Sequence, residues 1–427
     1  MDIRCQIHKS RRGERGVTAI HLLVILVPAL FALVGFAVDL GILYSIKGEL
    51  KSGANSMALA AASQLIGTDA SAGAANSAAL ATIETGSGFG NKYYFNGMAI
   101  GGSDGTLSST VTGPTFYATL ADALASGTTG GAAVGGALGR HTRVTLTGQT
   151  RLLFWSFIPI VSDRTVSVLA TAVAGMSPPL CLACGIEPYA VAAVSISDTT
   201  DFGFVPGTKY SFAYLCTGAP LPAILPGASQ SLTYILLNRL DPNAVIFPDE
   251  ASQAYRDLAG GLPGNTNSAQ ACFRVNNTEI LWADAAPNTC TTDSVAPVVI
   301  DALCGLDTRF ESTPPAVCAS IPGLDVLSAI YPPDTDVNDY DTYTDYTGDG
   351  RRIITIPIVD ALGTSSMTVL GFRQFLLIPD QGASDLNPAD NFGRFVAMYI
   401  GSVAPVKQGR FDGCQQTAGP GKVVLQQ

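Results

Sequence analysis

The chain has 427 residues and a formal net charge of −10, a length sufficient for two or three domains. Residues 1–38 carry five basic and two acidic side chains, whereas the rest of the chain carries 19 basic and 32 acidic ones. A body this acidic, without clustered Lys or Arg to neutralise phosphates, argues against nucleic acid as a partner. Its low content of charged residues, 14%, is typical of a secreted, β-rich chain.

An apolar run follows the basic N-terminus. Residues 17–38 carry no charge and are interrupted only by the polar Thr18 and His21. As a helix, this run would span about 33 Å, enough for the hydrocarbon core of a bilayer. The positive-inside rule makes residues 1–16 a cytoplasmic tail and places the chain beyond Asp39 outside. We therefore expect a single-pass membrane protein with a transmembrane helix over 17–38.

A secretion signal cleaved after Ala37 is the main alternative, because Gly35-Phe36-Ala37 fits a small-x-small site. However, the run exceeds the usual apolar core of a signal peptide, and helical periodicity continues beyond the cut. The spacing predicts an apolar helix face that packs against a partner, since small residues allow close approach. A plain anchor with no specialised role remains open. The predicted face comprises Leu43, Ile46, Leu50, Ala54, Met57, Ala61 and Leu65.

A recognisable pattern extends over the first 62 residues: a basic Arg-Gly element, a proline within the apolar run, a VDLG exit, a KGEL step and an Ala-rich helix end. These features occupy Arg15-Gly16, Pro28 and residues 38–41, 47–50 and 58–62. In this pattern the chain resembles the N-terminus of the TadE/TadG-type proteins of tight-adherence (Flp) pilus assembly.

The resemblance implies a retained anchor. Prepilin-type processing sites resemble G-x-x-x-x-E, but the fifth residue after Gly16 is His21, and a largely neutral His cannot replace the glutamate that registers prepilin subunits. TadG-like members keep their anchor. The resemblance thus implies a protein of the bacterial inner membrane with a cytoplasmic N-terminus and with its bulk in the periplasm or at the cell surface. Other pilus-assembly or secretion proteins would be its partners.

The fold class expected is α+β. After the transmembrane helix, the resemblance implies a pilin-like helix plus a membrane-proximal α+β region over residues 39–176. The pattern predicts a short helix at 74–83 and a Gly-rich linker at 126–139. Strands are predicted at 91–100, 143–150, 152–160 and 165–174.

A second, extracytoplasmic domain is predicted over residues 177–427, after Ser177-Pro178-Pro179. It is expected to be β-rich and disulfide-containing, with strands at 190–196, 352–359, 367–378 and 395–400. Many TadG relatives carry a von Willebrand A-type domain with a D-x-S-x-S metal motif. In this chain Asp198 is followed by two threonines and Asp201. The motif is therefore absent here, and we do not predict that metal site.

Eight cysteines follow the anchor, an even number that indicates up to four disulfides in an oxidising compartment. Proximity favours the pairs Cys272–Cys290 and Cys304–Cys318. The C-x-x-C of residues 181–184 could instead be a redox motif, but the Ser-Pro-Pro before it does not suit a helix N-terminus, so structural disulfides are expected. The candidates are Cys181, Cys184, Cys216, Cys272, Cys290, Cys304, Cys318 and Cys414.

The strongest chemical cluster is the acidic segment 331–352, which contains six Asp. Calcium prefers six to eight oxygen ligands, and acidic loops with side chains at alternate positions can supply them. A loop frame starting at Asp334 places Asp336, Asn338 and Asp345 at ligand positions, although Asp339 replaces the usual glycine. A frame starting at Asp345 lacks its last ligand. Calcium binding and a solvated acidic loop both remain open.

No catalytic signature appears: the only His beyond the anchor is His141, and no P-loop, G-x-S-x-G or H-E-x-x-H occurs. We expect a non-enzymatic, membrane-anchored component of tight-adherence pilus assembly. The alternative is a calcium-dependent extracytoplasmic binding or adhesion module on a generic anchor. A secreted hydrolase or thiol oxidoreductase is the third hypothesis.

Overall fold

The structure is a computed structural model. It describes residues 14–83, 108–125, 131–152, 154, 165–216, 221–238, 255–261, 272–281, 295–338, 341–363, 366–380, 386–401, 404–411, 414 and 416–426. Two compact units divide the chain. The first comprises residues 1–54, 83–112 and 145–171, and the second comprises residues 55–82, 113–144 and 172–427. The fold is α+β: one long apolar helix and a β-rich, disulfide-containing region.

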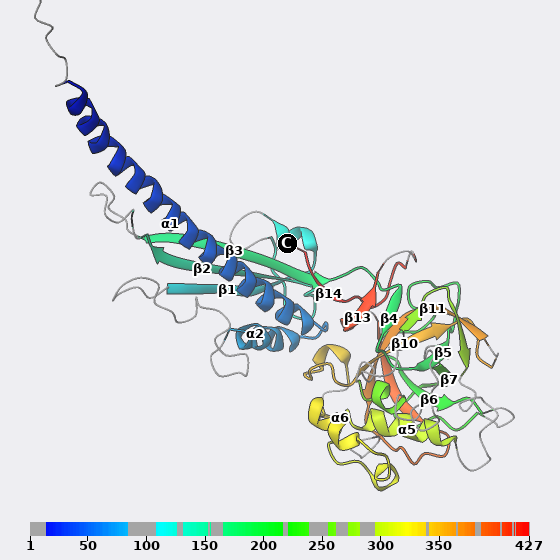
Figure 1. The fold of residues 1–427 in the computed structure, drawn as a ribbon. Coiled ribbons are helices and arrows are strands. Elements are labelled where there is room, and N and C mark those ends of the chain that lie inside the picture. Colours follow the sequence, from blue (N-terminus) through cyan, green and yellow to red (C-terminus); the bar gives the residue numbers. More distant parts are fainter. Residues whose placement is uncertain are drawn as a thin grey trace, which may run out of the picture. The chain divides into compact units, whose positions relative to one another are not determined.

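The longest element is the helix α1, Glu14–Ser63, with 50 residues and Pro28 in its interior (Figure 1). Its residues from Ile20 to Leu40 are mostly exposed and apolar, which makes α1 long and apolar enough to cross a membrane. After Ser63 the hydrogen bonds shift to a tighter turn, in which the Leu65 N–H donates to the Ala62 carbonyl, three residues back, at 3.3 Å. Gly67, four residues after the end of α1, has a φ of +87°, a left-handed conformation that glycine adopts without strain.

A four-stranded sheet has the order β1-β2-β3-β14. The last strand pairs antiparallel with β3, so the C-terminus of the chain completes this sheet. The predicted helix at 74–83 and the predicted strands at 143–150 and 165–174 are confirmed. The predicted strand at 91–100 and nearly all of 152–160 lie outside the described residues. The elements are α2 Ser71–Ala81, β1 Ser108–Tyr117, α3 Leu120–Leu124, β2 His141–Arg151, β3 Thr165–Met176 and β14 Val423–Leu425.

The β-rich region is built on a seven-stranded sheet in the order β10-β5-β7-β6-β12-β11-β9. Because β10 also pairs with β11, the pairings close a ring of six strands, and β9 joins β11 to β7. Two neighbouring pairs, β5–β10 and β6–β7, are parallel, and the rest are antiparallel. The strands are β5 Tyr189–Ala192, β6 Lys209–Tyr214, β7 Gln230–Asn238, β9 Thr278–Leu281, β10 Ile353–Val359, β11 Ser366–Ile378 and β12 Phe395–Gly401.

Alternate residues of these strands form the largest core cluster. In β6, for example, Tyr210, Phe212 and Tyr214 share one face, as the two-residue period of a strand requires. Phe212 stacks on Phe395 with ring centroids 4.8 Å apart. The helix α5, Pro297–Asp307, contributes apolar residues to the same cluster. The predicted strands at 352–359, 367–378 and 395–400 are confirmed, and that at 190–196 is shorter, as β5.

A small third sheet and a few short helices complete the described elements. The sheet has the order β13-β4-β8 and carries two of the disulfide cysteines. The short helix α6 follows Gly323, whose φ is +85°. These elements are β4 Leu182–Cys184, β8 Cys272–Arg274, η5 Ala316–Cys318, α6 Leu324–Ile330, η6 Tyr343–Asp345 and β13 Gln408–Arg410.

Candidate functional site: a cationic cleft beside the acidic loop

Among the predicted site residues, the cysteines form structural cross-links. Cys304 bonds Cys318, as predicted. The predicted pair Cys272–Cys290 is wrong, because Cys272 bonds Cys184, its register partner on the neighbouring strand. The pairing of β4 with β8 therefore decides which cysteines meet, and closeness in the sequence does not. Cys216 is also disulfide-bonded, and Cys290 lies outside the described residues.

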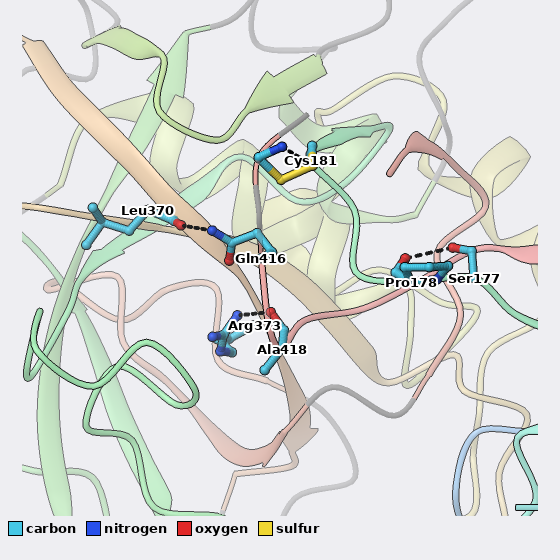
Figure 2. The surroundings of a disulfide bond; sticks show 8 residues. Ser177, Pro178, Cys181, Leu370, Arg373, Gln416 and Ala418 are labelled. Carbon is cyan, nitrogen blue, oxygen red and sulfur yellow. Dashed lines mark hydrogen bonds between the residues drawn. A yellow bond between two sulfur atoms is a disulfide. The ribbon is translucent and has the colours of Figure 1, made fainter. Parts of the chain in front are cut away.

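The third bond joins Cys181 to Cys414 and ties the C-terminal segment to the chain just before β4 (Figure 2). Beyond the bond, the same segment contacts β11: the Gln416 side chain donates to the Leu370 carbonyl at 3.1 Å, and Arg373 donates to the Ala418 carbonyl at 3.4 Å. The two cysteines of the C-x-x-C are thus committed to different long-range partners. This arrangement supports their structural interpretation over the redox one.

The acidic segment is held by its own hydrogen bonds. The Asp334 carboxylate is 6% exposed and accepts from the Tyr346 hydroxyl at 2.5 Å and from Arg352 Nε at 3.1 Å. Burial and Asp334 raise the pKa of Tyr346, so its hydroxyl keeps the proton that it donates. The carboxylate of Asp336 accepts from the Asn338 N–H at 3.3 Å, and that of Asp345 accepts from the Thr342 hydroxyl at 2.6 Å.

No group of three or more His, Cys, Asp or Glu side chains in the described part of the chain is arranged to hold a metal ion. Asp339 of the acidic segment lies outside that part. The calcium site of Asp334, Asp336, Asn338 and Asp345 therefore stays a prediction.

The loop around Asp198, which lacks the D-x-S-x-S motif, is closed by the Asp198 carboxylate. It accepts from the backbone N–H groups of Thr200, Asp201 and Gly203 at 3.0 to 3.2 Å. These hydrogen bonds lower the pKa of Asp198. The role of this carboxylate in the fold is therefore to shape the turn.

Most of the apolar helix face predicted from the sequence is buried within the chain. Six of its seven residues, all except Leu43, are at most 2% exposed within this single chain. They are buried by other parts of the same chain, and packing of this face against a separate protein stays a prediction. The six are Ile46, Leu50, Ala54, Met57, Ala61 and Leu65.

Further along α1 towards the N-terminus, the apolar run contacts another part of its own unit. The Phe154 N–H lies 3.1 and 3.2 Å from the two carboxylate oxygens of Asp39, which is 4% exposed. The Phe154 side chain lies over Gly35, where a Cβ would come within 2.6 Å of the ring. Residues on both sides of the hypothetical cut after Ala37 thus contact Phe154.

A cleft of about 490 Å³ lies beside the acidic segment and is lined by residues of the second unit. Its charged floor is an ion pair between Glu187, just before β5, and Arg309, just after α5. The second carboxylate oxygen of Glu187 accepts from the Thr355 N–H at 2.7 Å. Arg309 also donates to the carbonyls of Ala259 at 2.6 Å and Arg351 at 2.9 Å. Both charges of the pair are therefore satisfied internally.

A tight turn before β10 places two arginines in different surroundings. Asp349 accepts the Arg351 N–H at 2.9 Å, and Gly350 has a φ of +83°, both typical of an Asp-Gly turn. Arg352 is fully buried, with its guanidinium 4.9 Å from the Tyr346 ring centroid. Arg351 instead lines the cleft. Burial and the charge of Arg309 lower the pKa of Arg351 to about 9, so it remains protonated at neutral pH.

Tyr331, which follows α6, contacts two cations in the cleft. The Arg351 guanidinium lies 5.5 Å from the Tyr331 ring centroid, and Lys407 Nζ lies 4.1 Å from it. Gln374 of β11 forms part of the wall, where it bonds both the N–H and the carbonyl of Ala404, at 2.9 and 2.7 Å. Chemically, the cleft combines fixed cations, an aromatic face and backbone-anchored polar groups.

Sequence reasoning missed the cleft. Glu187, Arg309, Arg351 and Lys407 are separated by up to 220 positions, and no motif connects them. The one local signal was the Arg351-Arg352 doublet directly after the acidic segment. Comparisons with protein-family models, with known proteins and with solved structures gave no match to this chain.

Proposed function

We propose that this protein is a non-enzymatic, membrane-anchored component of tight-adherence (Flp) pilus assembly. In this proposal α1 anchors it in the bacterial inner membrane with a cytoplasmic N-terminus. The disulfide-containing β-rich region acts in the periplasm or at the cell surface, in contact with other pilus-assembly or secretion proteins. The pilus assignment is supported by the resemblance of residues 11–62 to TadE/TadG-type N-termini.

The observation that carries the anchoring part is the contact of Phe154 with Gly35, a residue of the apolar run. A discarded signal peptide has no reason to contact the mature protein, yet Gly35, which would be discarded by a cut after Ala37, lies against the Phe154 side chain. The continuity of α1 through Ala37 supports the same conclusion. Disulfides persist in oxidising compartments, which supports an extracytoplasmic location for the β-rich region.

The anchoring part is tested by the intact mass of the protein extracted from membranes. We expect the mass of the full chain, 44.2 kDa, apart from removal of the initiator Met. A mature N-terminus at Val17 would instead indicate prepilin-type processing. One at Val38 would indicate a cleaved signal, and either result would contradict the retained anchor.

The pilus part is tested by deleting the gene in the parent bacterium and counting surface pili and adherent cells. We expect both to fall and to be restored by the full chain. A matched complementing chain, in which an unrelated cleavable signal replaces residues 1–38, is expected to be exported without restoring pili. Normal piliation and adherence in the deletion strain would contradict the proposal.

A further inference from the structure

The cleft contains more positive charge than its own carboxylates neutralise. Arg309 is paired with Glu187, whereas Arg351 and Lys407 form no ion pair within the described part of the chain. Asp349, also at the cleft, directs a carboxylate oxygen to the backbone N–H of Arg351. A cationic cleft is unexpected in a chain whose residues after 38 carry 32 acidic and 19 basic side chains.

Hydrogen bonds to backbone carbonyls hold the Arg351 side chain in place in the cleft. Its guanidinium donates to the carbonyls of Gly260 and Thr308, which fix its direction. Its Nε is buried and has no hydrogen-bond partner. A buried N–H without an acceptor is costly, so the guanidinium as a whole is short of acceptors.

The second cation, Lys407, lines the same cleft. Lys407 is exposed, and its ammonium lies on the Tyr331 ring that the Arg351 guanidinium also approaches. The remaining walls include apolar side chains, among them Ile353 and Val406. A volume of about 490 Å³ falls in the range of small-molecule sites.

We propose that this cleft binds a small organic anion, whose carboxylate or phosphate group accepts hydrogen bonds from Arg351 and Lys407. The apolar part of the ligand lies against Tyr331 and Ile353. Planar guanidinium groups match both kinds of oxyanion, so the two head groups share one recognition chemistry. This binding site goes beyond the proposed function and does not depend on it.

The test is calorimetric titration of the full chain in lipid nanodiscs at fixed ionic strength. The probes are succinate for a carboxylate head group, inorganic phosphate for a phosphate, and succinamide as the neutral analogue of succinate. We expect at least one anion to bind with a dissociation constant of about 1 mM or lower, and succinamide to bind at least tenfold more weakly. Comparison of succinate with phosphate identifies the preferred head group.

Variants locate the binding. Arg351→Gln and Lys407→Gln should each weaken anion binding about tenfold or more, the usual effect of losing a charged hydrogen bond. Arg410→Gln removes the same charge from an exposed residue outside the cleft and should leave binding unchanged. Because Lys407 is exposed, its variant should keep the wild-type melting temperature. Absence of anion binding, equal binding of succinamide, or an equal loss in Arg410→Gln would overturn the proposal.

Discussion

The N-terminal part of α1 and the β-rich region both carry many large apolar side chains, but these are exposed on α1 and buried in the β-rich region. On α1, Ile25 is 72% and Phe31 68% exposed, whereas Phe375 and Tyr399 in the sheet core are fully buried. The sheet removes its apolar surface from water by packing, but this part of α1 has no such cover among the described residues. The exposed apolar surface of the helix is therefore suited to a membrane, whereas the β-rich region has a core of its own.

The largest effect is expected when charged residues are introduced into the exposed apolar part of α1. Leu26→Arg combined with Leu30→Arg should disfavour membrane insertion by about 5–7 kcal/mol, since each arginine near the centre of a span costs about 2.5–3.5 kcal/mol. The measurement is the fraction of protein that stays with membranes after alkaline extraction. The melting temperature of the β-rich region should not change.

Tyr44→Arg is the matched control, because Tyr44 is 70% exposed on the same helix but lies beyond the predicted span. It should leave membrane retention unchanged. Equal retention of the control and the double variant would show that residues 26 and 30 do not lie in lipid.

Removal of one partner of the buried ion pair should have the next largest effect. Glu187→Ala leaves Arg309 buried without a counter-charge, which should lower the free energy of unfolding by about 3–5 kcal/mol. Chemical denaturation followed by circular dichroism measures this change, and membrane retention should remain normal. Asp341→Ala is the control: this 91% exposed carboxylate lies 3.8 Å from Lys209, so its loss should cost less than about 1 kcal/mol.

The disulfides should contribute somewhat less each. Replacing Cys181 and Cys414 by serine should lower the free energy of unfolding by about 2–4 kcal/mol, since the bond restrains the unfolded chain. The same replacement of Cys304 and Cys318, only 14 positions apart, should cost less. Denaturation curves of the two double variants decide the order. A larger loss from the shorter loop would show that packing around the bond, and not chain restraint, dominates.

The smallest effect is expected for calcium. The Asp334 carboxylate is already neutralised by Arg352, so we expect the melting temperature to be the same with calcium and with a chelator. Thermal unfolding followed by circular dichroism is the measurement. A rise in the melting temperature with calcium that Asp336→Ala abolishes would instead establish the predicted site.

Local patterns in the sequence predicted much of the fold. The apolar run and its continuation predicted α1, and short β-like runs of residues predicted β10, β11 and β12 close to their observed bounds. Such patterns involve residues only a few positions apart, which is the range over which the helix and strand periods of 3.6 and 2 residues repeat. The closure of six strands into a ring was not predictable, because it depends on pairings such as β5 with β10, more than 150 residues apart.

A helix suited to a membrane, an acidic body and an even set of cysteines beyond that helix can all be recognised in the sequence. These properties follow from composition and short-range order alone. Three other features depend on how the chain folds: Cys272 joins Cys184, the residues from Ile46 to Leu65 on one helix face are buried, and Arg351 and Lys407 line one cleft. The physical reason is that strand pairing and core packing bring together residues distant in the chain, and no local pattern records which partner each will meet.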